Sequence, residues 1–325
     1  MHSWGGLLAL PTFSVSTTFF LRSDPNVLKK KNSVSVVDSM RPWWPLFLGP
    51  VTIAFIIGFV WPFFQGIYLS FCEFQVITDA HLSGIGNYIK AFQDPGFLRA
   101  FWYTALFSIV SLAIINVLAF IVAYLLTQEI KGSNLFRTVF FMPNLIGGIV
   151  LGYIWNMIFE GILSRFGMHL VMEPTFGFWG LIILVCWQQI GYMMIIYIAG
   201  LQNVPSDMLE AASMDGATKM QTLFKVTIPN VMPSITICMF LTLTNGFKLF
   251  DQNLALTGGQ PYVINPDGTS IHTTEMLALN IYNTFYGQAS NSRGVAQAKA
   301  VLFFILVAAI GLIQLRATRQ KEVQQ

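Results

Sequence analysis

The chain has 325 residues, of which 54% are hydrophobic and 10% are charged, and its formal net charge is +3 at pH 7. Globular domains carry about 25% charged residues, so this composition excludes an ordinary soluble enzyme or binding domain and indicates a membrane protein. The small net charge gives no reason to expect a nucleic-acid partner.

After residue 41, six long and mainly apolar stretches of the chain contain no Asp, Glu, Lys or Arg. Each is close to or longer than the roughly 20 residues that cross a hydrocarbon core of about 30 Å. Their apolar residues are continuous rather than alternating, which excludes membrane-spanning strands. We therefore predict an all-α polytopic membrane protein with six transmembrane helices, at about residues 46–68, 101–127, 138–159, 178–200, 233–250 and 295–315.

The segment before the first helix, residues 1–41, is predicted to be a tail that is disordered or lies at the interface. Its apolar stretch precedes its positive charges, which is the wrong polarity for a secretory signal. The aromatic residues after Met40 would suit an interfacial start, so the true start of the chain stays open. If the N-terminus is cytosolic, the segments on the cytosolic side contain more Lys and Arg than the segments on the outer side. This distribution favours a cytosolic position for both termini.

Local signals modify individual helices. Asp94-Pro95-Gly96 reads as a turn before the second helix. The third helix contains Pro143 and Gly147-Gly148, which permit bends and close helix approach in a membrane. The sixth apolar run is short, and we expect Lys299 and Arg316 at its ends to extend their charged groups outward to water.

Between the fourth and fifth helices, the inner loop at residues 201–229 is predicted to form a helix–turn–helix hairpin. Asp207 places negative charge at a helix N-terminus. Gly216 suits a left-handed residue at the end of that helix. Thr218 and Gln221 have the spacing of a capping box for the second helix. The hairpin is neither strongly basic nor aromatic, which favours a protein-docking element over the alternative, a helix pair lying on the lipid surface.

Glu210-Ala211-Ala212 followed by Gly216 and Pro229 resembles the coupling-loop signature of binding-protein-dependent ABC importer permeases. Phe250-Asp251, with the Leu256–Gly259 tract, is similar to the carbohydrate branch, and Trp187 lies in a tract similar to maltose-type permease subunits. The resemblance implies a type I ABC importer permease fold over residues 42–320, followed by a short C-terminal tail at 321–325. It also implies six residues that couple this chain to an ATPase: Glu210, Ala211, Ala212, Asp215, Gly216 and Pro229.

Polar groups inside membrane helices are costly unless they face a cavity or one another. Five residues match positions that face the sugar in the maltose-type subunit: Gln189, Tyr192, Thr242, Asn245 and Gly246. Gln188, a neighbouring polar residue, is added to this predicted substrate pathway. Hydrogen bonding between helices is the alternative for each of them. Lys248 and Asp251 are three residues apart, which predicts an ion pair at the outer rim.

The sequence contains no sign of a catalytic centre or a metal site. No lysine follows a glycine, which excludes a Walker A phosphate loop, and Cys72, Cys186 and Cys238 have neither disulfide nor zinc spacing. We therefore expect a non-enzymatic subunit without a cofactor, whose energy comes from ATP and Mg bound by another polypeptide.

The resemblance implies a sugar importer of the bacterial cytoplasmic membrane, embedded in membrane lipid. It implies three kinds of protein partner: a second permease subunit that is a paralogue, two ABC ATPase subunits and an extracytoplasmic sugar-binding protein. Two alternatives remain open, an ion-coupled secondary carrier and a non-transporting scaffold or sensor whose hairpin recruits a partner.

Overall fold

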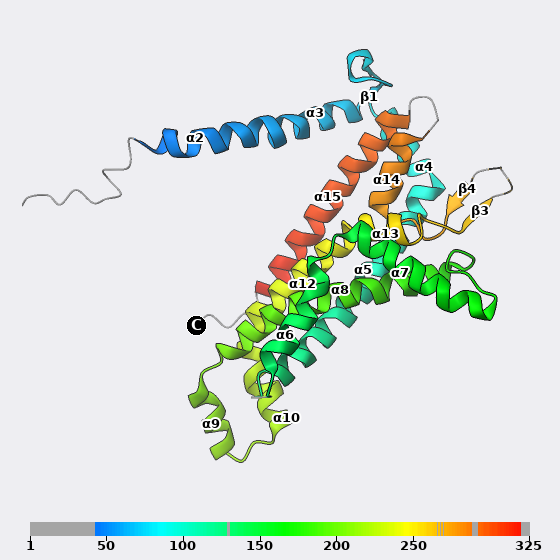
Figure 1. Ribbon diagram of the computed structural model, residues 1–325. Coiled ribbons are helices and arrows are strands. Elements are labelled where there is room, and N and C mark those ends of the chain that lie inside the picture. Colours follow the sequence, from blue (N-terminus) through cyan, green and yellow to red (C-terminus); the bar gives the residue numbers. More distant parts are fainter. Residues whose placement is uncertain are drawn as a thin grey trace, which may run out of the picture. The chain divides into compact units, whose positions relative to one another are not determined.

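The computed structural model describes residues 43–128, 131–264, 266, 268, 270–287 and 292–319 (Figure 1). The predicted tails at 1–41 and 321–325 lie outside these residues. The chain divides into two units, one ending at Phe59 and one beginning at Val60. Each unit is described by itself.

The first unit contains α2 (Trp44–Phe55) and most of a π-helical turn, Ile56–Val60. The rings of Phe55 and Phe59 stack with their centroids 5.2 Å apart. The stretch Pro45–Ser70, which extends into the second unit, is long and apolar enough to cross a membrane. This stretch agrees with the first predicted helix.

The second unit begins with α3 (Trp61–Ser70) and continues into a small folded segment rather than an irregular loop. This segment comprises β1 (Cys72–Glu73), a 3₁₀ turn (Ile77–Asp79), β2 (His81–Leu82) and α4 (Gly86–Gln93), with β1 and β2 antiparallel. The buried amide of Asn87 donates to the carbonyls of Ser70 and Cys72, at 3.0 and 2.9 Å, and so fixes α4 to the end of α3.

Helix α5 (Pro95–Leu126) has 32 residues and is therefore about 48 Å long. The predicted turn at its start is wrong. The Asp94 carboxylate accepts the Gly96 N–H at 2.8 Å and caps the helix, while Pro95 needs no donor at the first helical position. The same three residues that suggested a turn therefore begin the helix.

The third predicted helix is broken, so the prediction of one helix over 138–159 is wrong. The structure has α6 (Ser133–Phe141), a 3₁₀ turn (Met142–Leu145) and α7 (Gly148–Leu163). Pro143 lies in the turn, where its ring and missing N–H oppose a continuous helix. Gly147 follows in an extended conformation, so α7 starts in a new direction.

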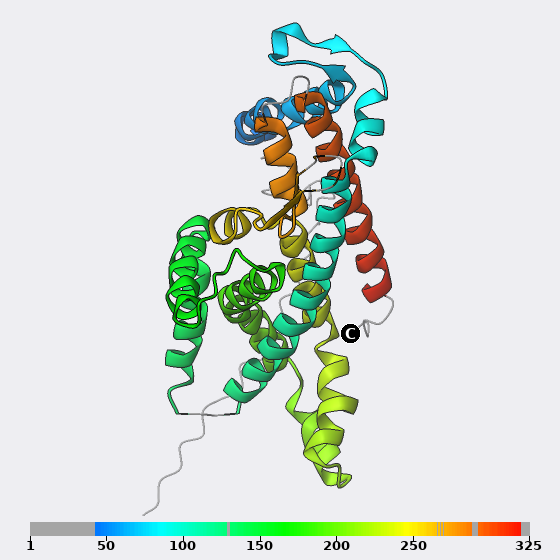
Figure 2. The ribbon, with the colours of Figure 1, turned by 90° about the vertical axis from the view of Figure 1, so that its right-hand side faces the viewer.

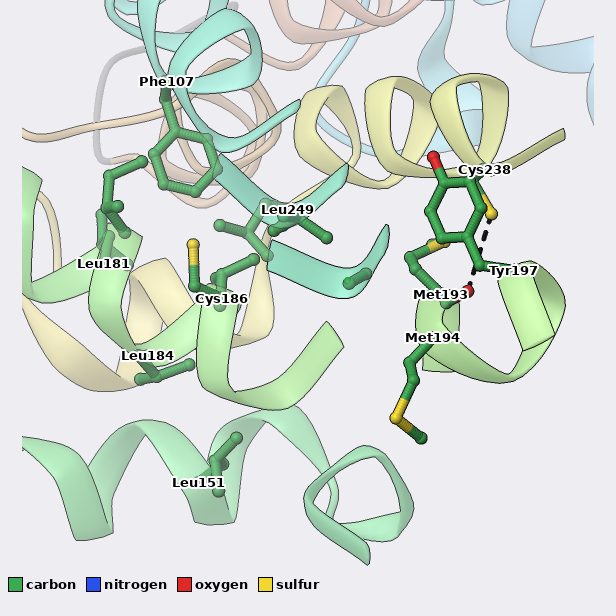
Figure 3. Close-up of a cluster of buried hydrophobic side chains, with 14 of the residues drawn as sticks. Phe107, Leu151, Leu181, Leu184, Cys186, Met193, Met194, Tyr197, Cys238 and Leu249 are labelled. Carbon is green, nitrogen blue, oxygen red and sulfur yellow. Dashed lines mark hydrogen bonds between the residues drawn. The ribbon is translucent and has the colours of Figure 1, made fainter. Parts of the chain in front are cut away.

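Helix α8 (Pro174–Gln202) is the central element of the second unit. Two thirds of its most apolar stretch (67%) is buried, against at most 28% in the other candidate spans. Gly191 brings α8 against the backbone of α6, because a β-carbon there would meet the Phe140 carbonyl. Figure 3 shows the buried side chains around α8, among them Phe107, Leu151, Leu181, Leu184 and Leu249.

The predicted hairpin follows α8. It consists of α9 (Ser206–Met214), α10 (Lys219–Thr222), a π-helical turn (Leu223–Thr227) and α11 (Ile228–Asn230), and it leads into α12 (Met232–Phe247). With 16 residues, α12 is about 24 Å long, short of the hydrocarbon core. Within the described residues, five helices can span a membrane, or six if α12 and the segment Lys219–Asn230, bent by 70°, form one span.

The stretch between the fifth and sixth predicted helices is mostly folded. It contains α13 (Asp251–Leu256), the antiparallel pair β3 (Tyr262–Ile264) and β4 (Ser270–His272), and α14 (Leu277–Tyr286). Helix α15 (Ser292–Arg319) follows and includes the sixth predicted span. Figures 1 and 2 show α9 and α10 at one end of the second unit and α14 at the other.

Lys299 of α15 does not extend to water as predicted, since its side chain is only 1% exposed. Its Nζ lies 2.6 Å from Asp94 Oδ2, 2.9 Å from Asn280 Oδ1 and 2.7 Å from Thr284 Oγ1. Helix α14 covers this position, and Asp94 supplies the opposite charge that burial of an ammonium requires. Arg316, at the other end of the span, is exposed as expected.

Candidate functional site

The turn of the hairpin depends on one glycine. Gly216 follows α9 with φ of +74°, a left-handed conformation that strains residues with a side chain. The Ala217 N–H then reaches back to the Ala212 carbonyl at 3.0 Å, closing the helix end as in a Schellman motif. The predicted conformation of Gly216 is confirmed.

The second helix of the hairpin is capped as predicted. Thr218 Oγ1 accepts the Gln221 N–H at 3.3 Å, and the Thr218 N–H donates to Gln221 Oε1 at 2.8 Å. Both hydrogen bonds of the capping box are therefore present. The hairpin has a defined shape at both ends of its turn.

The hairpin also exposes apolar side chains beside the predicted coupling residues. Met214 is 89% exposed, and Ala212 and Pro229 are half-buried. Exposed apolar patches rimmed by polar residues are typical of protein interaction sites. We call the following exposed residues the docking surface: Met208, Glu210, Ala211, Met214, Asp215, Gly216, Met220 and Phe224.

A cavity of about 440 Å³ lies on the other side of the hairpin. It is lined by the ends of α5 and α8 together with the hairpin itself, including Tyr124, Gln128, Leu201, Ser213 and Lys219. The hairpin therefore stands partly off the bundle. The chain joins the hairpin directly to the ends of α8 and α12.

Two predicted pathway residues, Gln189 of α8 and Asn245 of α12, line one open hollow of about 280 Å³. The hollow is completed by residues at the junction of α12 and α13: Lys248, Leu249, Phe250, Asp251 and Gln252. Gln189 Oε1 is buried and has no hydrogen-bond partner within the described part of the chain. Such an unpaired acceptor costs about 1–3 kcal/mol, so a ligand hydroxyl that donates to it would be favoured.

Lys248 and Asp251 line this hollow but do not form the predicted ion pair. Helix α12 ends at Phe247 and α13 starts at Asp251, so the two charged residues do not share a helical turn. Among the described residues, no ion pair joins Lys248 to Asp251. The prediction is wrong because it assumed one continuous helix through residue 250.

Gln188 and Thr242 follow the alternative interpretation, hydrogen bonding between segments. Gln188 donates to the Ile146 carbonyl at 3.2 Å and accepts from Gln252 Nε2 at 2.8 Å, joining the break between α6 and α7 to α13. Thr242 Oγ1 accepts from Asn116 Nδ2 at 3.3 Å. Neither side chain lines the hollow that contains Gln189.

The remaining two pathway residues serve packing in this structure. A β-carbon at Gly246 would lie 2.9 Å from Ser108 Oγ, so the glycine permits close contact of α12 with α5. Tyr192 is half-buried and packs against the core around α8. A role for either residue in the substrate pathway stays a prediction.

Sequence reasoning missed the two amides of α13. Gln252 lines the hollow and holds Gln188. Asn253 is fully buried, donates to the Thr274 carbonyl at 2.8 Å and accepts the Met276 N–H at 3.0 Å. The available signal was their position directly after Phe250-Asp251, inside a tract already noted for its resemblance to sugar permeases.

Comparisons with known proteins cover the bundle and the hairpin. Residues 115–320 match the family described as binding-protein-dependent transport system inner membrane component. The chain is 39% identical over 290 residues to the probable starch degradation products transport system permease protein AmyD of Thermoanaerobacterium thermosulfurigenes, covering 87% of this chain and 96% of the relative. It is 30% identical to the multiple sugar-binding transport system permease protein MsmF of Streptococcus mutans, covering 86% and 96%.

A solved structure with the same fold is a chain of a bacterial ABC transporter involved in the import of the acidic polysaccharide alginate. The TM-score is 0.71 at 20% identity, covering 88% of this chain and 98% of that chain. The family match extends over most of the chain and includes the hairpin, and the relatives match along nearly their whole length. This chain therefore belongs to the family of inner-membrane components of binding-protein-dependent transport systems.

Proposed function

We propose that this chain is the permease subunit of an ATP-driven ABC importer that moves a sugar or oligosaccharide across the bacterial cytoplasmic membrane. The observation that carries the proposal is the docking surface on a hairpin joined directly to α8 and α12, the two helices that supply Gln189 and Asn245 to the polar hollow. The names of the relatives, which refer to starch degradation products and multiple sugars, support the substrate class.

In this proposal the hairpin and both termini lie on the cytosolic face. The residues Glu210–Gly216 seat in a cleft of an ABC ATPase subunit, which binds ATP and Mg. Closure of two such subunits displaces the docking surfaces of this chain and of a second, paralogous permease. Since the hairpin continues into α8 and α12, that movement changes the access to the hollow.

An extracytoplasmic binding protein delivers the sugar at the opposite end of the bundle. The hollow suits an uncharged, hydroxyl-rich solute, because Gln189 and Gln252 offer amide groups that donate and accept hydrogen bonds. Lys248 and Asp251 add a charged donor and a charged acceptor, which form stronger hydrogen bonds to hydroxyls than neutral groups do.

A pair of glycine variants tests the docking assignment. Gly216 and Gly167 are both exposed and both left-handed, and an added β-carbon would meet open space at either position. We expect Gly216→Trp to abolish stimulation of ATP hydrolysis by the sugar-loaded binding protein in lipid, although the chain still inserts. Gly167→Trp, which carries the same backbone strain away from the docking surface, should retain it.

Equal ATPase activity of the two variants would contradict the docking assignment. Sugar uptake into proteoliposomes without ATP, driven by an ion gradient, would contradict an ATP-driven importer and favour a secondary carrier. Stable insertion without any sugar uptake or stimulated ATP hydrolysis would favour a scaffold or sensor.

A further inference from the structure

A row of aromatic rings lies at the end of the second unit opposite the hairpin. The ring centroids of Phe250 and Tyr282 are 5.2 Å apart, and those of Tyr282 and Tyr286 are 4.7 Å apart. The two tyrosines are four residues apart on α14 and therefore lie on one helix face. They are 41% and 67% exposed, so this face of the row is open.

The row lines an open hollow of about 370 Å³. The opposite wall is α15, which contributes Gln297 and the short side chains of Ala296 and Ala300. The small residues of α15 leave room beside the rings. The hollow therefore has a mostly apolar lining with aromatic rings on one wall and small side chains on the other.

This aromatic hollow is a neighbour of the polar hollow described above, because Phe250 lines both. Phe250 lines the polar hollow together with Gln189, Asn245 and Gln252. An apolar surface with a few convergent polar groups is the usual composition of a small-molecule site. A pyranose ring fits that combination, since its faces carry C–H groups and its rim carries hydroxyls.

We propose that Phe250, Tyr282 and Tyr286 form a stacking platform for a pyranose unit of an incoming oligosaccharide, while the next unit occupies the polar hollow. This inference rests on the proposed function and adds to it a second subsite and a substrate class of at least two linked pyranose units. A monosaccharide fills only one of the two hollows, so the platform favours longer substrates.

The position of the hollow favours a sugar as its occupant. Its lining is mostly apolar, which suits the C–H face of a pyranose ring against the aromatic rings. The hollow also shares Phe250 with the polar hollow, so two linked pyranose units could contact both at once.

The test uses the complete transporter, reconstituted in lipid with its second permease, ATPase subunits and binding protein. Uptake of radiolabelled maltose and maltotriose is measured for wild type and for Tyr282→Leu and Tyr286→Leu. Loss of an aromatic contact should raise the KM for maltotriose about threefold to tenfold, with a smaller change for maltose. The conservative variants Tyr282→Phe and Tyr286→Phe keep the ring and should stay near wild type.

Tyr153→Leu is the matched control, because Tyr153 is a 59% exposed tyrosine on α7 that lines neither hollow. Leucine variants that import maltotriose like this control would overturn the platform and leave the proposed function intact. If the leucine variants purify without the second permease, the aromatic row contacts that subunit rather than a sugar. This result would also overturn the platform. Failure of wild type to import these two sugars or any other sugar that its binding protein binds would overturn the proposed function and the platform with it.

Discussion

Replacement of Lys299 by methionine should strongly destabilise the second unit. The Lys299 ammonium is 1% exposed and bonds Asp94, Asn280 and Thr284, which tie α15 to α14 and to the start of α5. Methionine keeps most of the side-chain volume and removes the charge. Removing one member of a buried ion pair costs about 3–5 kcal/mol, mainly because the other is left unpaired. Asp94 is 36% exposed and keeps some hydration, so we expect a loss near the lower limit, about 3 kcal/mol.

A second ion pair in the same unit is the control. Lys90 Nζ lies 2.7 Å from Glu73 Oε1, a distance close to that of the buried pair, but the two side chains are 52% and 33% exposed. Exposed pairs contribute about 0–1 kcal/mol, so Lys90→Met should change stability little. Denaturant unfolding in mixed detergent micelles measures both losses. Equal losses for the two variants, or none for Lys299→Met, would refute the argument from burial.

Two further predictions concern packing and pH. Gly191→Ala should cost about 1–3 kcal/mol, because the new methyl group meets the Phe140 carbonyl, whereas Gly161→Ala, which has open space, should not lower the thermal unfolding midpoint. The hydrogen bond and charge of Lys90 lower the pKa of Glu73. The pair therefore stabilises the fold at pH values above the ordinary carboxyl pKa of about 4.3. This stabilisation is lost as the pH falls through the lowered pKa of Glu73. The wild type should therefore lose more stability than Glu73→Gln between pH 7 and pH 2, and identical pH profiles would contradict the assignment.

Features set by a few adjacent residues could be predicted from the sequence. The left-handed Gly216 and the capping box of Thr218 and Gln221 depend on backbone geometry within one turn, and both predictions are confirmed. The apolar runs likewise predicted the approximate positions of most spans, since the bilayer imposes a length on any helix that crosses it. The coupling role of the hairpin stays a prediction.

The remaining features depend on residues far apart in the sequence. The predicted environment of Lys299 was wrong because Asp94, its charged partner, lies 205 positions away. Gln188 and Gln189 are adjacent and chemically identical, yet one joins two segments and the other lines the polar hollow. Periodicity could not separate them, since the distinction depends on where α13 packs. The sequence predicts one helix that bends at Pro143, whereas the helix of the structure breaks there. The residues on both sides of Pro143 are similarly apolar, so composition gave no sign of two separate helices.

Accessibility and cross-linking of two single cysteines test the central claim most directly. The native residues Cys72, Cys186 and Cys238 are buried, so a new cysteine at Met214 on the docking surface or at Ile264 on β3, 89% and 66% exposed, gives the dominant signal. In intact cells, a membrane-impermeant maleimide should label Ile264→Cys and spare Met214→Cys. In membranes, Met214→Cys should cross-link to an ABC ATPase subunit. Labelling of Met214→Cys from outside the cell, or no cross-link to any ATPase, would contradict the account.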